Sequence, residues 1–110
     1  MKKLITILIT LISLNVIAQE VSRVEPPNWW AGMKSQELQL MVYGDKISET
    51  NVEINHPDVK VMSVTKVENA NYLFVDLLFD KNIKAGKFDI EFKKDGKVID
   101  SYSYEMWERK

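Results

Sequence analysis

The sequence contains no cysteine and a single histidine, His56. The absence of cysteine excludes disulfide bridges and thiolate chemistry. It also leaves one histidine with no sulfur ligands beside it, which is too little for a structural zinc site or for Cys–His catalysis. His56 precedes Pro57 in a turn-like stretch and is best interpreted as an exposed turn residue. We therefore expect no metal, no cofactor and no catalytic residue in this chain.

Other catalytic and binding signatures are missing as well. The four glycines stand singly, so there is no glycine-rich phosphate loop, and no nucleophile elbow surrounds any serine. The acidic residues are scattered through the chain, and no acid/base pair stands out. Lysine and arginine together number 15 against 16 acidic residues, so there is no electrostatic case for a nucleic-acid partner.

One long apolar run is present, in the first 19 residues, "MKKLITILITLISLNVIAQ". Two lysines, an apolar stretch and a small residue, Ala18, are typical of a cleavable secretory signal peptide. The run is short for a membrane span, although an uncleaved anchor stays open as an alternative. We predict a signal peptide over 1–18, a single domain over 19–110, no membrane association after cleavage, and a periplasmic or secreted location.

The rest of the chain has a period of two, which indicates strands with one buried face. In "KFDIEFK", Phe88, Ile90 and Phe92 share one side of the strand. Asp95-Gly96 follows and is a strong hairpin signal, because both turn positions need positive φ. The return strand is "VIDSYSYEM", so a hairpin is predicted over about 87–106.

Four further stretches alternate in the same way: "ELQLMVY", "NVEIN", "VKVMSVTKV" and "NYLFVDLLF". The alternation in the third slips around Met62 and Ser63, which predicts a β-bulge. Turn residues separate the stretches, and no helical period follows residue 19. The fold class predicted is all-β, an antiparallel β-sandwich of about seven strands.

Two of these strands are apolar on both faces. The second faces carry, besides the expected polar residues, Met41, Tyr43, Tyr72, Phe74 and Leu78. A solvated sheet face is mostly polar. Either these are surface apolar residues of a central strand, or this face and Trp107 form a docking surface for another domain.

Adjacent tryptophans in "EPPNWWAG" raise the question of what covers them. Pro26-Pro27 stiffens the approach, which suggests a loop held in one shape. If the pair were extended, the two indoles would face opposite sides, one to the core and one to the surface. Three interpretations stay open. At least one indole is buried in the domain's own core, or the pair contacts another domain, or Trp29 and Trp30 form a sugar-binding platform on which Asn28 hydrogen-bonds the sugar hydroxyls. Trp107 would cover the edge of the sandwich.

The stretches "VEPPNWWAGMKSQELQLMVYG", "VENANYLFVDLLF" and "KFDIEFKKDGKVIDSYSYEMWER" together resemble the N-terminal domain of bacterial neopullulanases and cyclomaltodextrinases. These are α-amylase-superfamily glycoside hydrolases. The resemblance implies an immunoglobulin-like, early-set sandwich that precedes a catalytic (β/α)₈ barrel acting on α-1,4-glucans. The family's catalytic Asp and Glu residues lie in that barrel, so none transfers to this chain.

The sequence thus predicts an exported accessory module and no enzyme by itself. Its expected partners are an α-glucan oligosaccharide, bound weakly, and a catalytic barrel or a second copy of the chain. The alternative is a docking or dimerisation module with no sugar affinity.

Overall fold

The computed structural model describes residues 21–109. In this part of the chain, strands and one short 3₁₀ turn follow in the order β1 (Val21–Glu25), β2 (Asn28–Trp30), β3 (Glu37–Gly44), η2 (Ile47–Glu49), β4 (Asn51–Ile54), β5 (Val59–Lys66), β6 (Tyr72–Phe79), β7 (Gly86–Lys94) and β8 (Lys97–Trp107). The predicted signal peptide, 1–18, lies outside the described residues. Between residues 21 and 109 no helix is long and apolar enough to cross a membrane.

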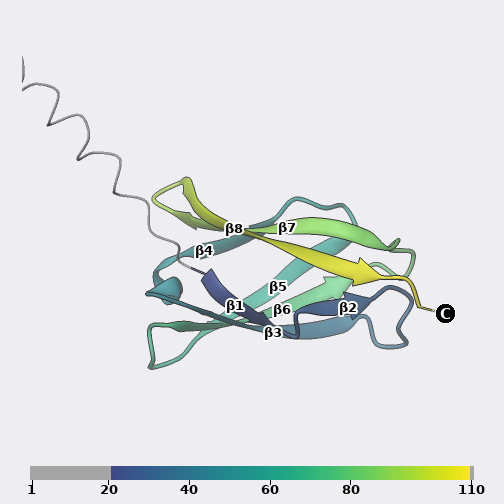
Figure 1. The fold of residues 1–110 in the computed structure, drawn as a ribbon, viewed down its shortest axis with the longest axis horizontal. Coiled ribbons are helices and arrows are strands. Elements are labelled where there is room, and N and C mark those ends of the chain that lie inside the picture. Colours follow the sequence, from purple (N-terminus) through teal and green to yellow (C-terminus); the bar gives the residue numbers. More distant parts are fainter. Residues whose placement is uncertain (1–20, 110) are drawn as a thin grey trace, which may run out of the picture.

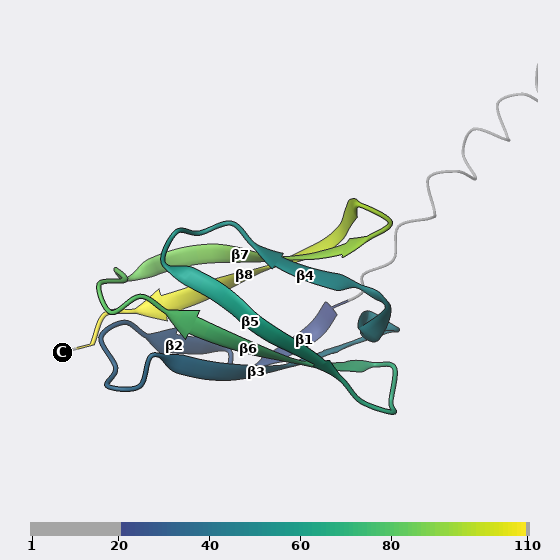
Figure 2. The same cartoon turned by 180° about the vertical axis from the view of Figure 1, so that it is seen from behind.

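The strands form two four-stranded sheets, ordered β1-β3-β6-β5 and β2-β8-β7-β4. Figures 1 and 2 show the sheets as two layers, with β4, β7 and β8 in the upper one and β1, β3, β5 and β6 in the lower one. The prediction of an all-β sandwich is therefore confirmed. The described residues contain eight strands, where about seven were expected.

Alternation along the strands builds the core between the layers. On β6, Leu73, Val75, Leu77 and Phe79 are buried, and on β7 Phe88, Ile90 and Phe92 are buried opposite them. Each such side chain contributes about 1.5–3 kcal/mol when it leaves water. Because the chain has no cysteine, this apolar packing holds the two sheets together without disulfides.

The hairpin of β7 and β8 is as predicted. Lys94 faces Lys97 across the turn, and Asp95 and Gly96 have φ of 54° and 78°. Asp and Gly both tolerate this left-handed region, so the turn can reverse the chain in two residues. The bulge in β5 is also confirmed, because the register shifts between Val61 and Ser63 and leaves Met62 59% exposed.

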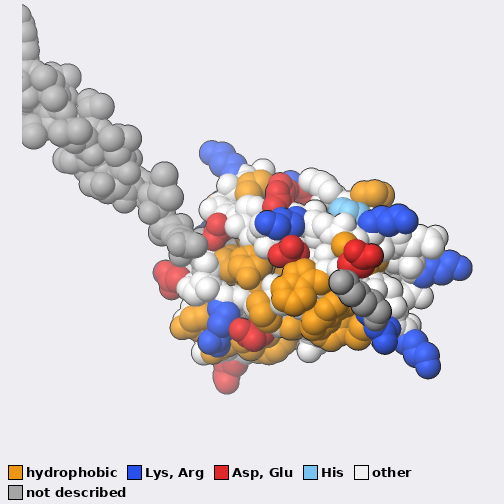
Figure 3. All heavy atoms as spheres, turned by 45° about the vertical axis from the view of Figure 1, so that its right-hand side comes forward, with side chains coloured by type: hydrophobic (Ala, Val, Ile, Leu, Met, Phe, Trp, Pro, Cys, Tyr) orange, Lys and Arg blue, Asp and Glu red, His pale blue; other side chains and the backbone are white. Residues whose placement is uncertain are grey.

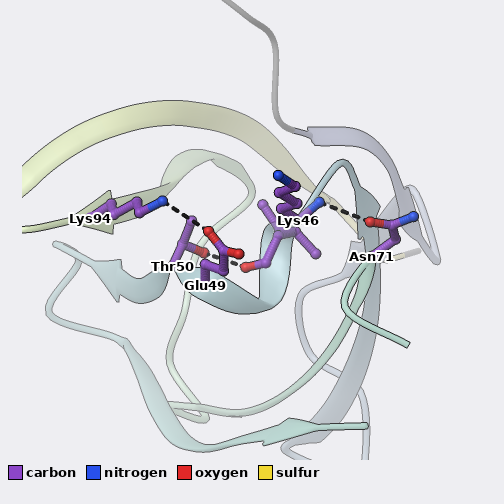
Figure 4. A network of polar contacts seen from close by, with 6 residues as sticks. Lys46, Glu49, Thr50, Asn71 and Lys94 are labelled. Carbon is purple, nitrogen blue, oxygen red and sulfur yellow. Dashed lines mark hydrogen bonds and ion pairs between the residues drawn. The ribbon is translucent and has the colours of Figure 1, made fainter. Parts of the chain in front are cut away.

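The 3₁₀ turn η2 was not predicted (Figure 4). Lys46 enters it with φ 55°, and its backbone N–H donates to Asn71 Oδ1 over 2.9 Å. Lys94 Nζ donates to Glu49 Oε1 over 2.8 Å, and this bond, together with the positive charge, lowers the pKa of Glu49. The turn thus ties the hairpin of one sheet to the β5–β6 loop of the other.

The strand β2 is the main departure from the predicted antiparallel pattern. The stretch expected to be a loop is extended and pairs parallel to β8, with Asn28, Trp29 and Trp30 opposite Glu105, Met106 and Trp107. Pro26-Pro27, with a cis bond before Pro26, carries the chain from the edge of one sheet to the edge of the other. Because the chain crosses without reversing, β2 runs in the same direction as β8.

Candidate functional site

In the extended strand β2, Trp29 packs against the core and Trp30 is exposed, yet the two rings contact each other, with centroids 5.6 Å apart. Trp29 lies opposite the buried Met106 and packs against the hydrophobic core. Its Nε1 is covered and has no hydrogen-bond partner among the described residues. Trp29 is therefore partly buried against the core, and because its ring is tilted by 59° from that of Trp30, the two do not form one flat platform.

Trp30 instead pairs with the tryptophan at the far end of the domain. Trp30 and Trp107 lie in register on β2 and β8, with ring centroids 5.7 Å apart and planes at 86°. They are 36% and 46% exposed. Figure 3 shows hydrophobic side chains gathered in a patch on the side of the molecule where Figure 1 places β2 and the end of β8. The exposed aromatic site is thus the Trp30–Trp107 pair.

Polar residues border this pair on the same sheet. Asn28 and Glu105 face each other in register, and Lys87 faces Glu105 from the other side. The Asn28 amide nitrogen is covered and without a partner among the described residues, so it is poorly placed for a sugar hydroxyl. Its predicted sugar-binding role stays a prediction, and the exposed carboxylate of Glu105 is the more accessible polar group.

The predicted docking surface is divided by the fold, because Trp107 lies on β8 whereas its other five residues lie on the other sheet. We call the part on that sheet the tyrosine face: it is the outer side of β3 and β6, formed by Met41, Tyr43, Tyr72, Phe74 and Leu78. Tyr43 and Tyr72 pair across the strands with centroids 5.0 Å apart, and the Arg23 guanidinium lies 5.8 Å from the Tyr43 ring. All five side chains are half-buried, so they already shield one another in part.

A carboxylate interrupts the tyrosine face. Asp76 accepts hydrogen bonds from Gln39 Nε2 at 3.0 Å and from Ser63 Oγ at 2.7 Å. The bulge at Met62 sets the register that places Ser63 opposite Asp76. Both carboxylate oxygens are therefore satisfied within the domain, which makes a charge on an apolar face tolerable.

Comparison with known proteins identifies the chain's relatives. The sequence model of the family described as "Cyclomaltodextrinase, N-terminal" matches residues 23–110. The chain belongs to this family. Membership implies an accessory domain of an amylase-family enzyme, and the resemblance found in the sequence is confirmed.

His56 and the acidic residues are the side chains of this cyclomaltodextrinase N-terminal domain that could bind a metal ion. Among the described residues no group of three or more His, Cys, Asp or Glu is placed to hold a metal ion. His56 sits in its turn, where Nδ1 accepts the Asp58 backbone N–H over 3.0 Å and the ring contacts Phe88. It therefore serves the local packing of the turn.

The contact between the Trp30 and Trp107 rings was not predicted from the sequence. The two residues are far apart in the chain, and only the parallel pairing of β2 with β8 brings them together. One signal was available: Trp107 falls in phase with Ser103 and Glu105 on the polar side of its strand, so its indole had to face outward.

Proposed function

We propose that this accessory domain binds α-glucan chains weakly through the Trp30–Trp107 pair and so holds substrate near the catalytic part of its enzyme. The observation that supports this is two exposed indoles, in register on adjoining strands, with the polar residues Glu105 and Lys87 beside them. The C–H face of a pyranose is apolar and stacks on flat aromatic rings, while charged rim groups bond its hydroxyls.

The apolar area that the two indoles can still bury is consistent with weak binding. A buried indole removes about 150–250 Å² from water, and each of these two retains a substantial part of that area exposed. Covering about 100 Å² of it gains roughly 2.5 kcal/mol at about 25 cal/mol per Å². With one or two hydrogen bonds added, the total is near the roughly 4 kcal/mol that corresponds to a Kd of about 1 mM.

Titration of the purified protein with maltoheptaose and with β-cyclodextrin tests the proposal. Calorimetry should show saturable binding at millimolar sugar, and Trp107→Ala should abolish it. Met62→Ala is the matched control, because Met62 is more exposed than either indole yet lies on β5, in the other sheet. No saturable signal at tens of millimolar sugar would overturn the proposal.

The tyrosine face favours a second candidate function, docking onto the catalytic barrel or a second copy of the chain. Its aromatic residues lie together on β3 and β6, away from the indole pair. In this case the sugar titration would be flat. Phe74→Asp would then weaken association of this domain with the barrel, measured by analytical ultracentrifugation, whereas Asp89→Asn on the opposite sheet would leave it unchanged.

We also propose that the protein is exported and that its sandwich is of the immunoglobulin-like type. The basic, apolar and small-residue order of 1–18 supports export, and the sheet-switching first segment that pairs parallel to the last strand supports an immunoglobulin-like sandwich. Mass spectrometry of the mature protein tests export: its N-terminus should be Gln19. Recovery of the protein with Met1 from the cytoplasm would contradict it.

A further inference from the structure

The three tryptophans form a chain of contacts that leads from the core to the surface. Trp29 packs on the core and contacts Trp30 with centroids 5.6 Å apart, and Trp30 contacts Trp107 at 5.7 Å. Trp30 therefore has a ring on each side, while Trp107 has one ring neighbour among the described residues. Trp107 is also the more exposed, at 46% against 36%.

The backbone around Trp107 is held in place. Its carbonyl oxygen accepts the Ala31 N–H over 2.8 Å, and Arg109 Nη1 donates to the Gly32 carbonyl oxygen over 3.4 Å. These bonds fasten the end of β8 to the turn after β2. A ring on a fixed backbone, braced by a second ring, is preorganised for stacking and loses little entropy on binding.

The angle between the exposed rings limits what can stack on them. At 86° the edge of one indole meets the face of the other. Consecutive sugar units of a glucan cannot both lie flat on two touching rings that stand perpendicular to each other. The pair therefore offers one stacking surface in place of an extended platform.

A hydrogen-bonding group stands beside that surface. Glu105 precedes Trp107 by two residues on the same side of β8, so the two side chains are about 7 Å apart along the strand. The Glu105 side chain is exposed and makes no hydrogen bond or ion pair within residues 21–109. Its carboxylate is free to accept hydroxyl hydrogens from a sugar stacked on Trp107.

We propose that Trp107 is the single stacking residue of the site, that it takes one pyranose ring, that Glu105 accepts its hydroxyls, and that Trp30 is a positioning residue. This inference rests on the proposed function, because it specifies how the same site holds an α-glucan. It assigns the recognition to one glucose unit, whatever the length of the chain that carries it.

Chain-length dependence of affinity tests the inference. Calorimetry with maltose, maltotriose and maltoheptaose should give Kd values that differ by less than tenfold, because only the number of glucose units available to the site changes. A tenfold or larger gain from maltose to maltoheptaose would overturn the single-ring site and leave the proposed function standing. No binding of any of the three would overturn both.

Variants separate the roles of the residues. Trp107→Ala should abolish binding, and Trp107→Phe should retain a weaker, saturable signal. Glu105→Gln should weaken sugar binding several-fold, whereas Asp89→Asn, on the neighbouring strand of the same face, should leave the affinity unchanged. Equal losses from Glu105→Gln and Asp89→Asn would contradict the role of Glu105.

The positioning role of Trp30 has its own readout. Trp30→Ala should remove the exciton couplet of the paired indoles from the far-ultraviolet circular dichroism spectrum and weaken maltose binding, and Trp30→Phe should restore part of the affinity. If Trp30→Ala removed the couplet and left maltose affinity unchanged, Trp30 would have no positioning role.

Discussion

The hydroxyl of Tyr104 donates a 2.9 Å hydrogen bond to the carbonyl oxygen of Pro26, 78 residues earlier in the chain. Tyr104 is fully buried, and Pro26 lies at the point where the chain passes from one sheet to the other. The bond holds this crossing in place and so sets the position of β2 beside β8. Together with the backbone bond from Ala31 to Trp107, it holds Trp30 next to Trp107.

Replacing Tyr104 with Phe removes this bond and leaves the rest of the ring in place. We expect the free energy of unfolding to fall by about 1 kcal/mol, because one partly buried hydrogen bond is lost and the Pro26 carbonyl is left without it. Urea unfolding of the wild type and Tyr104→Phe measures this. A difference below a few tenths of a kcal/mol would show that water replaces the hydroxyl at no cost.

Alkaline pH should destabilise the wild type through the same residue. Burial, and secondarily the nearby Tyr102, raises the pKa of Tyr104 above its ordinary value of 10.0. The folded state therefore favours the neutral phenol, so the stabilisation is fully present below about pH 10 and is lost as the pH rises from there toward the folded-state pKa. The stability gap between the wild type and Tyr104→Phe should be constant up to about pH 9 and shrink by pH 11, measured by urea midpoints. A gap that widened would contradict this.

Core and surface tryptophans should differ in their effect on stability. Trp29→Ala should cost about 3 kcal/mol, because it removes a large side chain packed on the core. Trp107→Ala should cost about 1 kcal/mol or less, since mainly its edge-to-face contact with Trp30 is lost. Thermal unfolding of both variants checks this, with Trp29→Phe as an intermediate control. Equal losses from the two alanine variants would contradict the separation of roles.

The hairpin turn should be sensitive to loss of its glycine. Gly96 has φ 78°, and a Cβ placed there would meet no heavy atom within 4 Å. The cost of Gly96→Ala is therefore that of the left-handed backbone alone, about 1 kcal/mol. Lys97→Ala, at the neighbouring strand position, is the control and should be near neutral. A neutral Gly96→Ala would mean that the turn adopts another conformation in solution.

Local patterns in the sequence were sufficient for much of the fold. Alternation predicted the buried faces of β3, β6 and β7, because a strand with one buried side shows its pattern within seven residues. Asp95-Gly96 predicted the hairpin, and the break in alternation at Met62 predicted the bulge. Each of these features depends on residues that are neighbours in the chain.

Features that depend on distant parts of the chain were not predicted. The strand character of Asn28–Trp30 comes from pairing with β8, and three residues after two prolines carry no strand signal of their own. The turn η2 begins at Lys46, where a left-handed backbone is held by the distant Asn71. For the same reason the sequence predicted a pairing of Trp30 with Trp29 but not its contact with Trp107, which comes from the distant strand β8.

The indole N–H signals of the three tryptophans in a ¹⁵N–¹H NMR spectrum give the most direct test of the central claim, α-glucan binding at the exposed indoles. Assigned through single Trp→Phe variants, the Trp107 signal should shift saturably with added maltose, the Trp30 signal should shift less, and the Trp29 signal should stay in place. Signals for all three that remain fixed at tens of millimolar maltose, or a shift confined to Trp29, would contradict it.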